Sequence, residues 1–246
     1  VMENEELLKS RLLTLVKKFC KRTKLPFPSS VFGNADEQIK QVMGLLEEEG
    51  IDLNKRGAWE GTTQEASFST LAAEDQGAMT TIAGAGFDYI INDTIWDRTS
   101  RLPVLGPKSS QDWQALKAVV TTGPRYRFRI RTGKLLFNPS PPASDSCFFE
   151  YHSKYWILDT DGSTRKEYFT ADSDTLLIPE TLLLMGLRWR CKKEKGLAYA
   201  QDFETYEFQV KDALGRDGGK EVLYQDDEAS RGPQPGIWVP GGNWNL

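Results

Sequence analysis

The sequence predicts an α+β fold in which helices from both ends of the chain form a four-helix bundle around an inserted β-rich domain. Residues 179–219 carry two consecutive amphipathic helical patterns, and two more lie near the start of the chain. Residues 59–175 change to alternating apolar and polar residues separated by turn signals. We therefore expect a helical bundle from residues 1–58 and 176–219, an inserted β-rich domain from 59–175, and an extended C-terminal arm from 220–246.

The stretch from Pro179 to Gly219 predicts a helical hairpin. Pro179 suits a first helical position, because the N–H that proline lacks has no helical partner there. Lysines end the first helix and Gly196 is the expected left-handed cap, while Gly218 and Gly219 end the second. Two helices joined by so short a linker form an antiparallel pair. The apolar stripes comprise Leu182, Leu183, Met185, Leu187 and Trp189 in the first helix, and Tyr199, Phe203, Tyr206, Val210 and Leu214 in the second.

Two further helices are expected before residue 59. The first spans residues 4–22, and it ends at the sequence LPFPSS because two prolines prevent its continuation. Asn34 is the expected cap of the second helix, in which Gly50 is a candidate point for a bend or a break. The apolar faces of these helices comprise Leu8, Leu12, Leu15 and Phe19 in the first, and Ile39, Val42, Met43, Leu46 and Leu53 in the second. Such faces would cover the hairpin and complete a bundle.

The inserted domain is expected to mix strands with short helices. TQEASFSTL alternates as a half-buried strand does, GAMTTIAGAGF predicts a short helix or a loop, and CFFEYHSKYWIL predicts a strand that ends at DTDG. SSQDWQALKAVV predicts a short helix capped by Ser109 or Ser110, with Trp113, Leu116 and Val120 facing inward. The clearest hairpin joins RYRFRIR to KLLFNP through a Thr132-Gly133 turn.

Composition and charge restrict the class of protein. Of the 246 residues 39% are hydrophobic and 27% charged, which is ordinary for a soluble globular protein. No apolar run is long enough for a membrane span, and the acidic opening of the chain does not resemble a signal peptide. The net charge of −4 means that affinity for nucleic acid cannot rest on overall charge. Cys20, Cys147 and Cys191 are odd in number and lack a CxxC motif, so we expect buried thiols in a reducing compartment.

No catalytic, cofactor-binding or metal site is expected. The single histidine, His152, follows Cys147 by five residues, which would point the two side chains to opposite faces of a strand. GxSxG, HExxH, P-loop and GxGxxG motifs are absent. Asp159, Asp161 and Gly162 resemble the start of a calcium loop, but Thr170 stands where the loop needs a glutamate, so a tight turn is expected. A carboxylate pair for glycoside cleavage stays open, because its spacing depends on the fold.

One strand carries a regular charge pattern. Arginines alternate with Tyr126, Phe128 and Ile130, so a strand would place all the guanidinium groups on one face. The arginines are Arg125, Arg127, Arg129 and Arg131. They indicate either an ordinary half-exposed strand or a docking face for an acidic partner or DNA phosphates.

The C-terminal arm combines residues that suit neither a core element nor a solvated tail. Residues 232–246 contain four glycines, three prolines and two tryptophans, with no helical or strand period. Such a segment is expected to become ordered against another surface, because tryptophan is a frequent anchor in interfaces. The alternative is that it folds back on its own domain.

Extended segments of the chain resemble the head-to-tail adaptor (head completion, or tail tubular) proteins of short-tailed bacteriophages. The segments are LLTLVKKFCKRTKLPFPSSVFG, YIINDTIWDRTSRLPVLGPKSSQDWQALKA, GPRYRFRIRTGKLLFNPSPPA, LRWRCKKEKGLAYAQDFETYEFQV and IWVPGGNWNL. They are spread from near the start of the chain to its end, so the resemblance extends over nearly the whole chain, and they contain no catalytic signature.

The resemblance implies a structural virion protein without enzymatic activity or cofactor, made in the host cytoplasm. Copies of such adaptors form a homo-oligomeric ring, typically of twelve, below the portal protein, and the ring continues the channel through which the genome passes. Some members are monomeric until they meet the portal. The inserted domain would face a tail nozzle or hub protein, and the arm would bind the portal. The arm residues that the resemblance implies for this contact are Ile237, Trp238, Val239, Pro240, Trp244 and Leu246.

Two other functions stay open from the residues alone. One is a tail-associated hydrolase that cleaves cell-wall glycan with a carboxylate pair. The other is a non-viral binding module whose arginine strand captures an acidic partner. For the adaptor, mild acidity would let DNA slide through the ring rather than bind to it.

Overall fold

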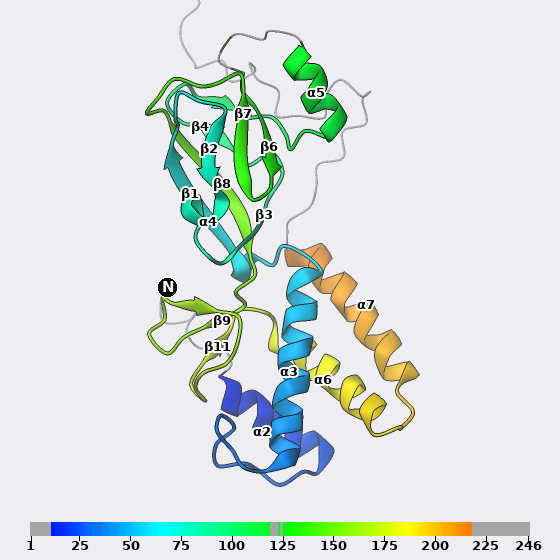
Figure 1. Cartoon of the computed structure of the whole chain (residues 1–246). Helices are drawn as coiled ribbons and strands as arrows, with labels where there is room; N and C mark the ends of the chain where they lie inside the picture. Colours follow the sequence, from blue (N-terminus) through cyan, green and yellow to red (C-terminus); the bar gives the residue numbers. More distant parts are fainter. Residues whose placement is uncertain (1–10, 119–122, 124, 218–246) are drawn as a thin grey trace, which may run out of the picture. The chain divides into compact units, whose positions relative to one another are not determined.

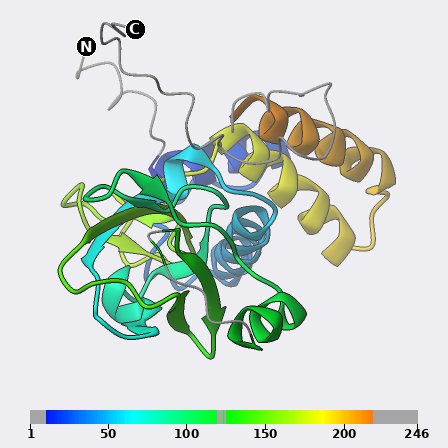
Figure 2. The ribbon, with the colours of Figure 1, turned by 90° about the horizontal axis from the view of Figure 1, so that it is seen from above.

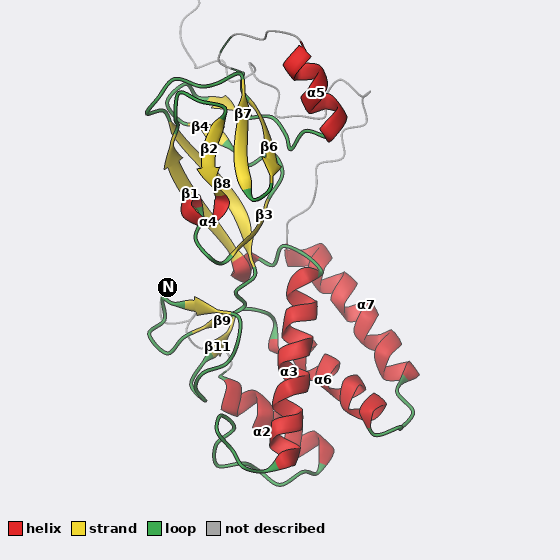
Figure 3. Cartoon of the chain, in the orientation of Figure 1, coloured by secondary structure: helices red, strands yellow, loops and turns green. Residues whose placement is uncertain are grey.

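The computed structural model describes residues 11–118, 123 and 125–217. Helices and strands are both abundant in it, which confirms the α+β class (Figure 3). The described residues divide into two compact units, each with its own hydrophobic core. We call residues 11–63 with 152–217 the helical unit, and the described part of 64–151 the strand unit.

The limits of the two units differ from those that the sequence suggested near residues 59 and 175. They fall between Thr63 and Gln64 and between Tyr151 and His152. Residues 152–175 therefore belong with the helices. The physical reason is that Trp156, Ile157 and Phe169 are buried in the same hydrophobic cluster as the helix faces.

The helical unit is built on α6, which contacts each of the other long helices (Figure 1). The helices are α2 (Leu12–Thr23), α3 (Glu37–Lys55), α6 (Glu180–Glu194) and α7 (Ala200–Asp217). α6 and α7 run side by side in both views, as expected for a helical hairpin (Figure 2). Among the side chains at the centre of this core are Leu15, Phe19, Leu46, Leu53, Leu183, Leu187 and Tyr206.

Pro179 is the N-cap of α6, with φ −55°, and so lies one position before the first helical position that the sequence suggested. The turn between α6 and α7 follows the sequence prediction. Gly196 has φ +65°, and its N–H donates to the carbonyl of Lys193 while that of Leu197 donates to Lys192. These are the hydrogen bonds of a left-handed helix end. Gly218 and Gly219 lie outside the described residues.

The start and course of α3 correct two expectations. Asp36, not Asn34, is the N-cap: its Oδ1 accepts from the N–H of Gln38 over 2.9 Å. Asn34 instead accepts from the N–H of Asp36, which fixes the turn before the helix. α3 also continues through Gly50 without a break, and a Cβ at this position would overlap the ring of Trp156. Gly50 is therefore a point of close packing between α3 and the chain after β8.

The expected strand CFFEYHSKYWIL is divided into two. β8 (Ser146–Ser153) ends where the Oγ of Ser153 accepts from the N–H of Tyr155, and β9 (Ile157–Leu158) begins after this turn. β9 is the central strand of a small antiparallel sheet in the helical unit, between β10 (Arg165–Lys166) and β11 (Thr175–Leu176). The turn after β9 is closed by the Asp161 carboxylate, which accepts from the N–H groups of Ser163 and Thr164.

In the described residues, the strand unit contains two sheets. One has the order β1-β8-β4-β5, with β3 also paired to β8, and the other has the order β2-β7-β6. Their remaining strands are β1 (Thr63–Ser69), β2 (Asp75–Ala78), β3 (Phe87–Ile90), β4 (Trp96–Asp97), β5 (Leu102–Pro103), β6 (Arg127–Arg131) and β7 (Lys134–Asn138). Short helical segments are η1 (Glu60–Thr62, in the helical unit), α4 (Met79–Ile82) and α5 (Ser110–Ala118). The core contains Met79, Ile95, Val104, Phe128, Leu135, Phe137, Cys147 and Phe149.

The structure confirms the predicted β6–β7 hairpin and the predicted short helix α5, with the turn and the cap at the expected residues. Thr132 and Gly133 have φ +53° and +71°, and Arg131 pairs with Lys134 across this two-residue turn. Positive φ at both central positions defines the type I′ turn that suits a twisted hairpin. Ser109 caps α5 by accepting from the N–H of Asp112, and Trp113 is fully buried. Among the described helices, none combines the length and the apolar character that crossing a bilayer requires.

Candidate docking surface on the strand unit

The arginine strand has the alternation that its sequence predicts. Tyr126 and Phe128 are buried, whereas Arg127 and Arg129 are half-buried and Arg131 is exposed. Arg125 precedes β6 and is also exposed. The guanidinium groups therefore lie on the solvent side of β6, because side chains of a strand alternate between its faces.

These arginines have no carboxylate partner in the part of the chain that the structure describes. The hydrogen bond found there for one of their guanidinium groups joins Nη2 of Arg129 to Oγ of Ser110, over 2.6 Å. Serine is neutral and does not balance the charge. By contrast, Lys134 on the neighbouring strand pairs with Asp75, with 2.6 Å between Nζ and Oδ2. The positive charge of β6 is thus available to an external group.

β6 lies between β7 and an extended segment that leads to α5. The N–H of Phe128 donates to Leu105, and the N–H of Lys108 donates to Phe128, both over 2.9 Å. These bonds hold Lys108 and the first residues of α5 beside Arg129. A second cationic side chain is thereby placed next to the arginine strand, from a different segment of the chain.

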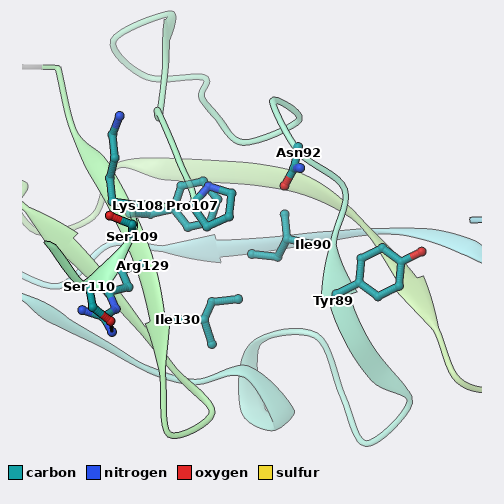
Figure 4. Close-up of a pocket in the computed structure, with 10 residues that line it drawn as sticks. Tyr89, Ile90, Asn92, Pro107, Lys108, Ser109, Ser110, Arg129 and Ile130 are labelled. Atoms are coloured by element: carbon teal, nitrogen blue, oxygen red, sulfur yellow. Dashed lines mark hydrogen bonds between the residues drawn. The ribbon is translucent and has the colours of Figure 1, made fainter. Parts of the chain in front are cut away.

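A hollow of about 460 Å³ opens between this segment, β6 and the end of β3. Ile90, Phe128 and Ile130 give it apolar walls, together with the exposed Pro107. Ile90, Ile130 and Pro107 gather around its centre, whereas Ser109, Ser110 and Arg129 lie at the side away from Tyr89 (Figure 4). Asn92 and Lys108 complete the polar rim. The hollow therefore combines an apolar interior with a rim that carries positive charge and hydrogen-bonding groups.

Tyr89 closes the hollow on the side opposite Arg129 and is 41% exposed. Partial burial raises the pKa of its hydroxyl, and the nearby Asp88 carboxylate raises it further. The hydroxyl therefore keeps its proton at neutral pH and can donate a hydrogen bond.

Sequence patterns identified only part of this surface. The arginines of β6 follow from their period of two, but Ile90, Asn92, Pro107 and Lys108 lie on loops and strand ends without a spacing that would link them. The Ser109 cap is the one available sign that Lys108 lies at the start of a helix. The predicted arm residues Ile237, Trp238, Val239, Pro240, Trp244 and Leu246 lie outside the described residues.

The cysteines and the histidine occupy packed environments. Cys147 is fully buried in the strand unit, where burial and the Asp97 carboxylate raise the pKa of its thiol to about 12. His152 is fully buried in the helical unit, with Nε2 at 3.2 Å from Oδ1 of Asn54. Cys20 and Cys191 are free thiols, the second of them half-buried. Within the described ranges there is no group of three or more histidine, cysteine, aspartate or glutamate side chains able to hold a metal ion.

Asp97 and Asp145 are a pair of carboxylates close enough to interact. Burial raises the pKa of Asp145, and the Asp97 charge adds to the rise. Asp97, however, is fully buried and accepts from the N–H groups of Thr99 and Ser100 and from the Ser100 hydroxyl. Its lone pairs are used to close the turn after β4, which is a structural role.

No family model matches the chain, and no curated protein matches it.

Proposed function

We propose that this protein is a structural head-to-tail adaptor of a short-tailed bacteriophage, which joins the portal vertex to the tail and continues the DNA channel. The proposal begins from the extended sequence segments that resemble such adaptors. The main structural support is the organisation of the chain into two units. The strand unit, which carries the arginine strand without carboxylate partners among the described residues, is inserted into a helical unit formed from residues 11–63 and 152–217. A subunit of this kind presents two unlike surfaces on separate cores.

An adaptor ring needs surfaces for its neighbouring copies and a separate surface for the tail. In a closed ring each contact is heterologous, so one patch of a subunit meets a different patch of the next. In this proposal α2, α3, α6 and α7 act as a four-helix bundle that packs against neighbouring copies. The strand unit remains available to a nozzle or hub protein of the tail, and the C-terminal arm binds the portal. The protein is then a component of the virion with no catalytic task.

Electron microscopy of the purified chain, alone and mixed with its portal protein, tests the proposal. Rings at the portal vertex are expected with the full chain. A variant lacking residues 231–246 should stay folded by circular dichroism and no longer join portal-containing heads. Normal assembly of the truncated protein would disprove the role of the arm, and the absence of rings with the full chain would disprove the adaptor role.

A matched pair of variants separates the portal contact from the tail contact. Substituting both Trp238 and Trp244 with alanine should abolish portal binding, whereas reversing Arg127 and Arg129 to glutamate should leave portal binding intact and weaken attachment of the tail component. Clearing of labelled peptidoglycan by the full chain, lost on substitution of a single carboxylate, would instead establish the hydrolase.

A further inference from the structure

The hollow beside β6 has an interior suited to an apolar side chain. Phe128 is fully buried and Ile90 is 6% exposed, so both belong to the rigid core of the strand unit. Ile130 is half-buried and packs against the same core. A side chain entering between Ile90 and Ile130 would therefore meet walls that are already fixed, which favours binding because little order has to be created.

The rim of the hollow is suited to carboxylates. Lys108 and Arg129 line it, and neither has an ion-pair partner within the described ranges. Lys108 is held by its backbone bond to Phe128, and Arg129 by its bond to Ser110. Two cationic side chains beside an apolar interior, one of them with its guanidinium group held in place, complement a segment that carries both an apolar anchor and acidic neighbours.

The shape of the interior favours a peptide over a nucleic acid. Nucleic-acid grooves hold bases by stacking them on aromatic rings. In this hollow the central labelled side chains are Ile90, Ile130 and Pro107, and Tyr89 lies at the far side from the cations (Figure 4). The ring of Phe128 also lines the hollow, but it is fully buried and offers no face for a base to stack on. An apolar centre with cations along one side fits a leucine, isoleucine or aromatic side chain of a protein better than it fits a stacked base with its phosphate.

We propose that this hollow binds an acidic peptide segment of a partner protein, with one large apolar side chain between Ile90 and Ile130 and flanking carboxylates on Lys108 and Arg129. This inference rests on the proposed adaptor function in taking the partner to be a tail protein, and it names the chemistry that such a partner must offer. The binding itself is a property of the isolated chain.

Selection from a library of random 12-residue peptides displayed on yeast, with the full chain as bait, tests the proposal. The selected peptides should share at least two acidic residues next to one large apolar residue. The tightest peptide, labelled with fluorescein, is then measured by fluorescence anisotropy. Lys108→Glu and Arg129→Glu should each weaken it by about tenfold or more. Arg131→Glu is the matched control, because Arg131 lies on the same strand outside the hollow, and it should have a clearly smaller effect.

Specific results would contradict the peptide-binding proposal. The proposal is wrong if the library yields no binder, if the selected peptides are not acidic, or if Arg131→Glu weakens binding as much as Arg129→Glu. It is also wrong if a twelve-nucleotide oligothymidylate binds the chain and displaces the peptide, since the surface would then serve nucleic acid. These measurements use no portal or virion, so failure of the adaptor function and failure of the peptide site give different results.

Discussion

Glu49 on α3 and Arg190 on α6 form an ion pair inside the helical unit, with 2.5 Å between Oε2 and Nε. The Glu49 side chain is fully buried, and that of Arg190 is 11% exposed. The same guanidinium group contacts Glu48 and, over 3.2 Å, Asp52 of α3. Gly186 of α6 makes room for the pair, because a Cβ there would overlap the Glu49 carboxyl group. Charge and close packing thus connect α3 to α6 at the same place.

Removal of Arg190 should be strongly destabilising. Arg190→Met leaves the Glu49 carboxylate buried without its cation, and breaking such a pair costs about 3–5 kcal/mol. Urea denaturation followed by circular dichroism measures this loss. The double variant Glu49→Gln/Arg190→Met is the control, since it removes the buried charge as well and should recover part of the stability. Equal stability of the single and the double variant would show that the pair is not coupled.

The stability that Glu49 contributes should depend on pH. Burial raises the pKa of Glu49, although the nearby Tyr206 hydroxyl and the bonded Arg190 guanidinium group oppose the rise. A carboxyl group with a raised pKa in the folded state binds its proton more tightly there than in the unfolded chain. Its contribution is therefore most favourable at low pH, and it declines as the pH rises from about 4.3, the unfolded value, through the folded pKa. Glu49→Gln should remove this decline, which denaturation curves at a series of pH values will show.

Two glycines of α3 should respond in opposite ways to alanine. Gly50→Ala places a methyl group on the Trp156 ring, and overpacking of this kind costs about 1–3 kcal/mol. Gly44 is exposed, and a Cβ added there would meet no atom within 4 Å, so Gly44→Ala should stabilise by up to about 1 kcal/mol through helix propensity. Melting temperatures of the two variants give the comparison. A neutral Gly50→Ala would mean that α3 and Trp156 are less closely packed than the structure indicates.

The β6–β7 turn offers a stabilising change. Thr132 is β-branched and has a positive φ, which is unfavourable, while asparagine adopts this conformation readily. We expect Thr132→Asn to raise the free energy of unfolding by about 0.5–1 kcal/mol. Thr132→Ala removes the branch without the preference of asparagine and should stay closer to the wild type. A less stable Asn variant in chemical denaturation would contradict the type I′ turn.

The thiols should react slowly in the folded protein. Burial raises the pKa of Cys191 to about 11 and that of Cys147 to about 12, so little of either is ionised at pH 8. With a chromogenic disulfide reagent, the half-buried Cys191 should react first, and Cys20 and Cys147 only on unfolding. Cys191→Ser should remove the first phase. A fast reaction that persists in this variant would show that a buried thiol is reached without unfolding.

Local sequence patterns predicted the structure correctly where that structure depends on residues close together in the chain. Gly196, Ser109 and Gly133 adopt the conformations that their residue types favour, because each forms its bonds within a few positions. The expectation that Asn34 caps α3 was wrong, since the cap is Asp36 and both residue types cap helices equally well. Sequence alone had no means to distinguish them.

Contacts between distant segments were not predictable in the same way. The role of Gly50 depends on Trp156, more than a hundred residues later in the chain, and its residue type suggested a bend. The candidate docking surface shows the same limit. The period of β6 revealed its arginines, but Lys108 joins them only through the pairing of the segment near Leu105 with β6, and Ile90 lies on β3, which pairs with β8. Long-range pairing, which periodicity does not encode, decides which side chains meet.

The division of the chain at Thr63 and Tyr151 has a consequence for the order in which the protein folds during synthesis. The strand unit is encoded without interruption, so residues 64–151 are synthesised before any part of α6. The core of the helical unit must wait for α6 and α7, since α2 and α3 bury their faces against α6. Early folding of the strand unit would bring the two halves of the helical unit closer than a free loop would, which lowers the entropy cost of joining them.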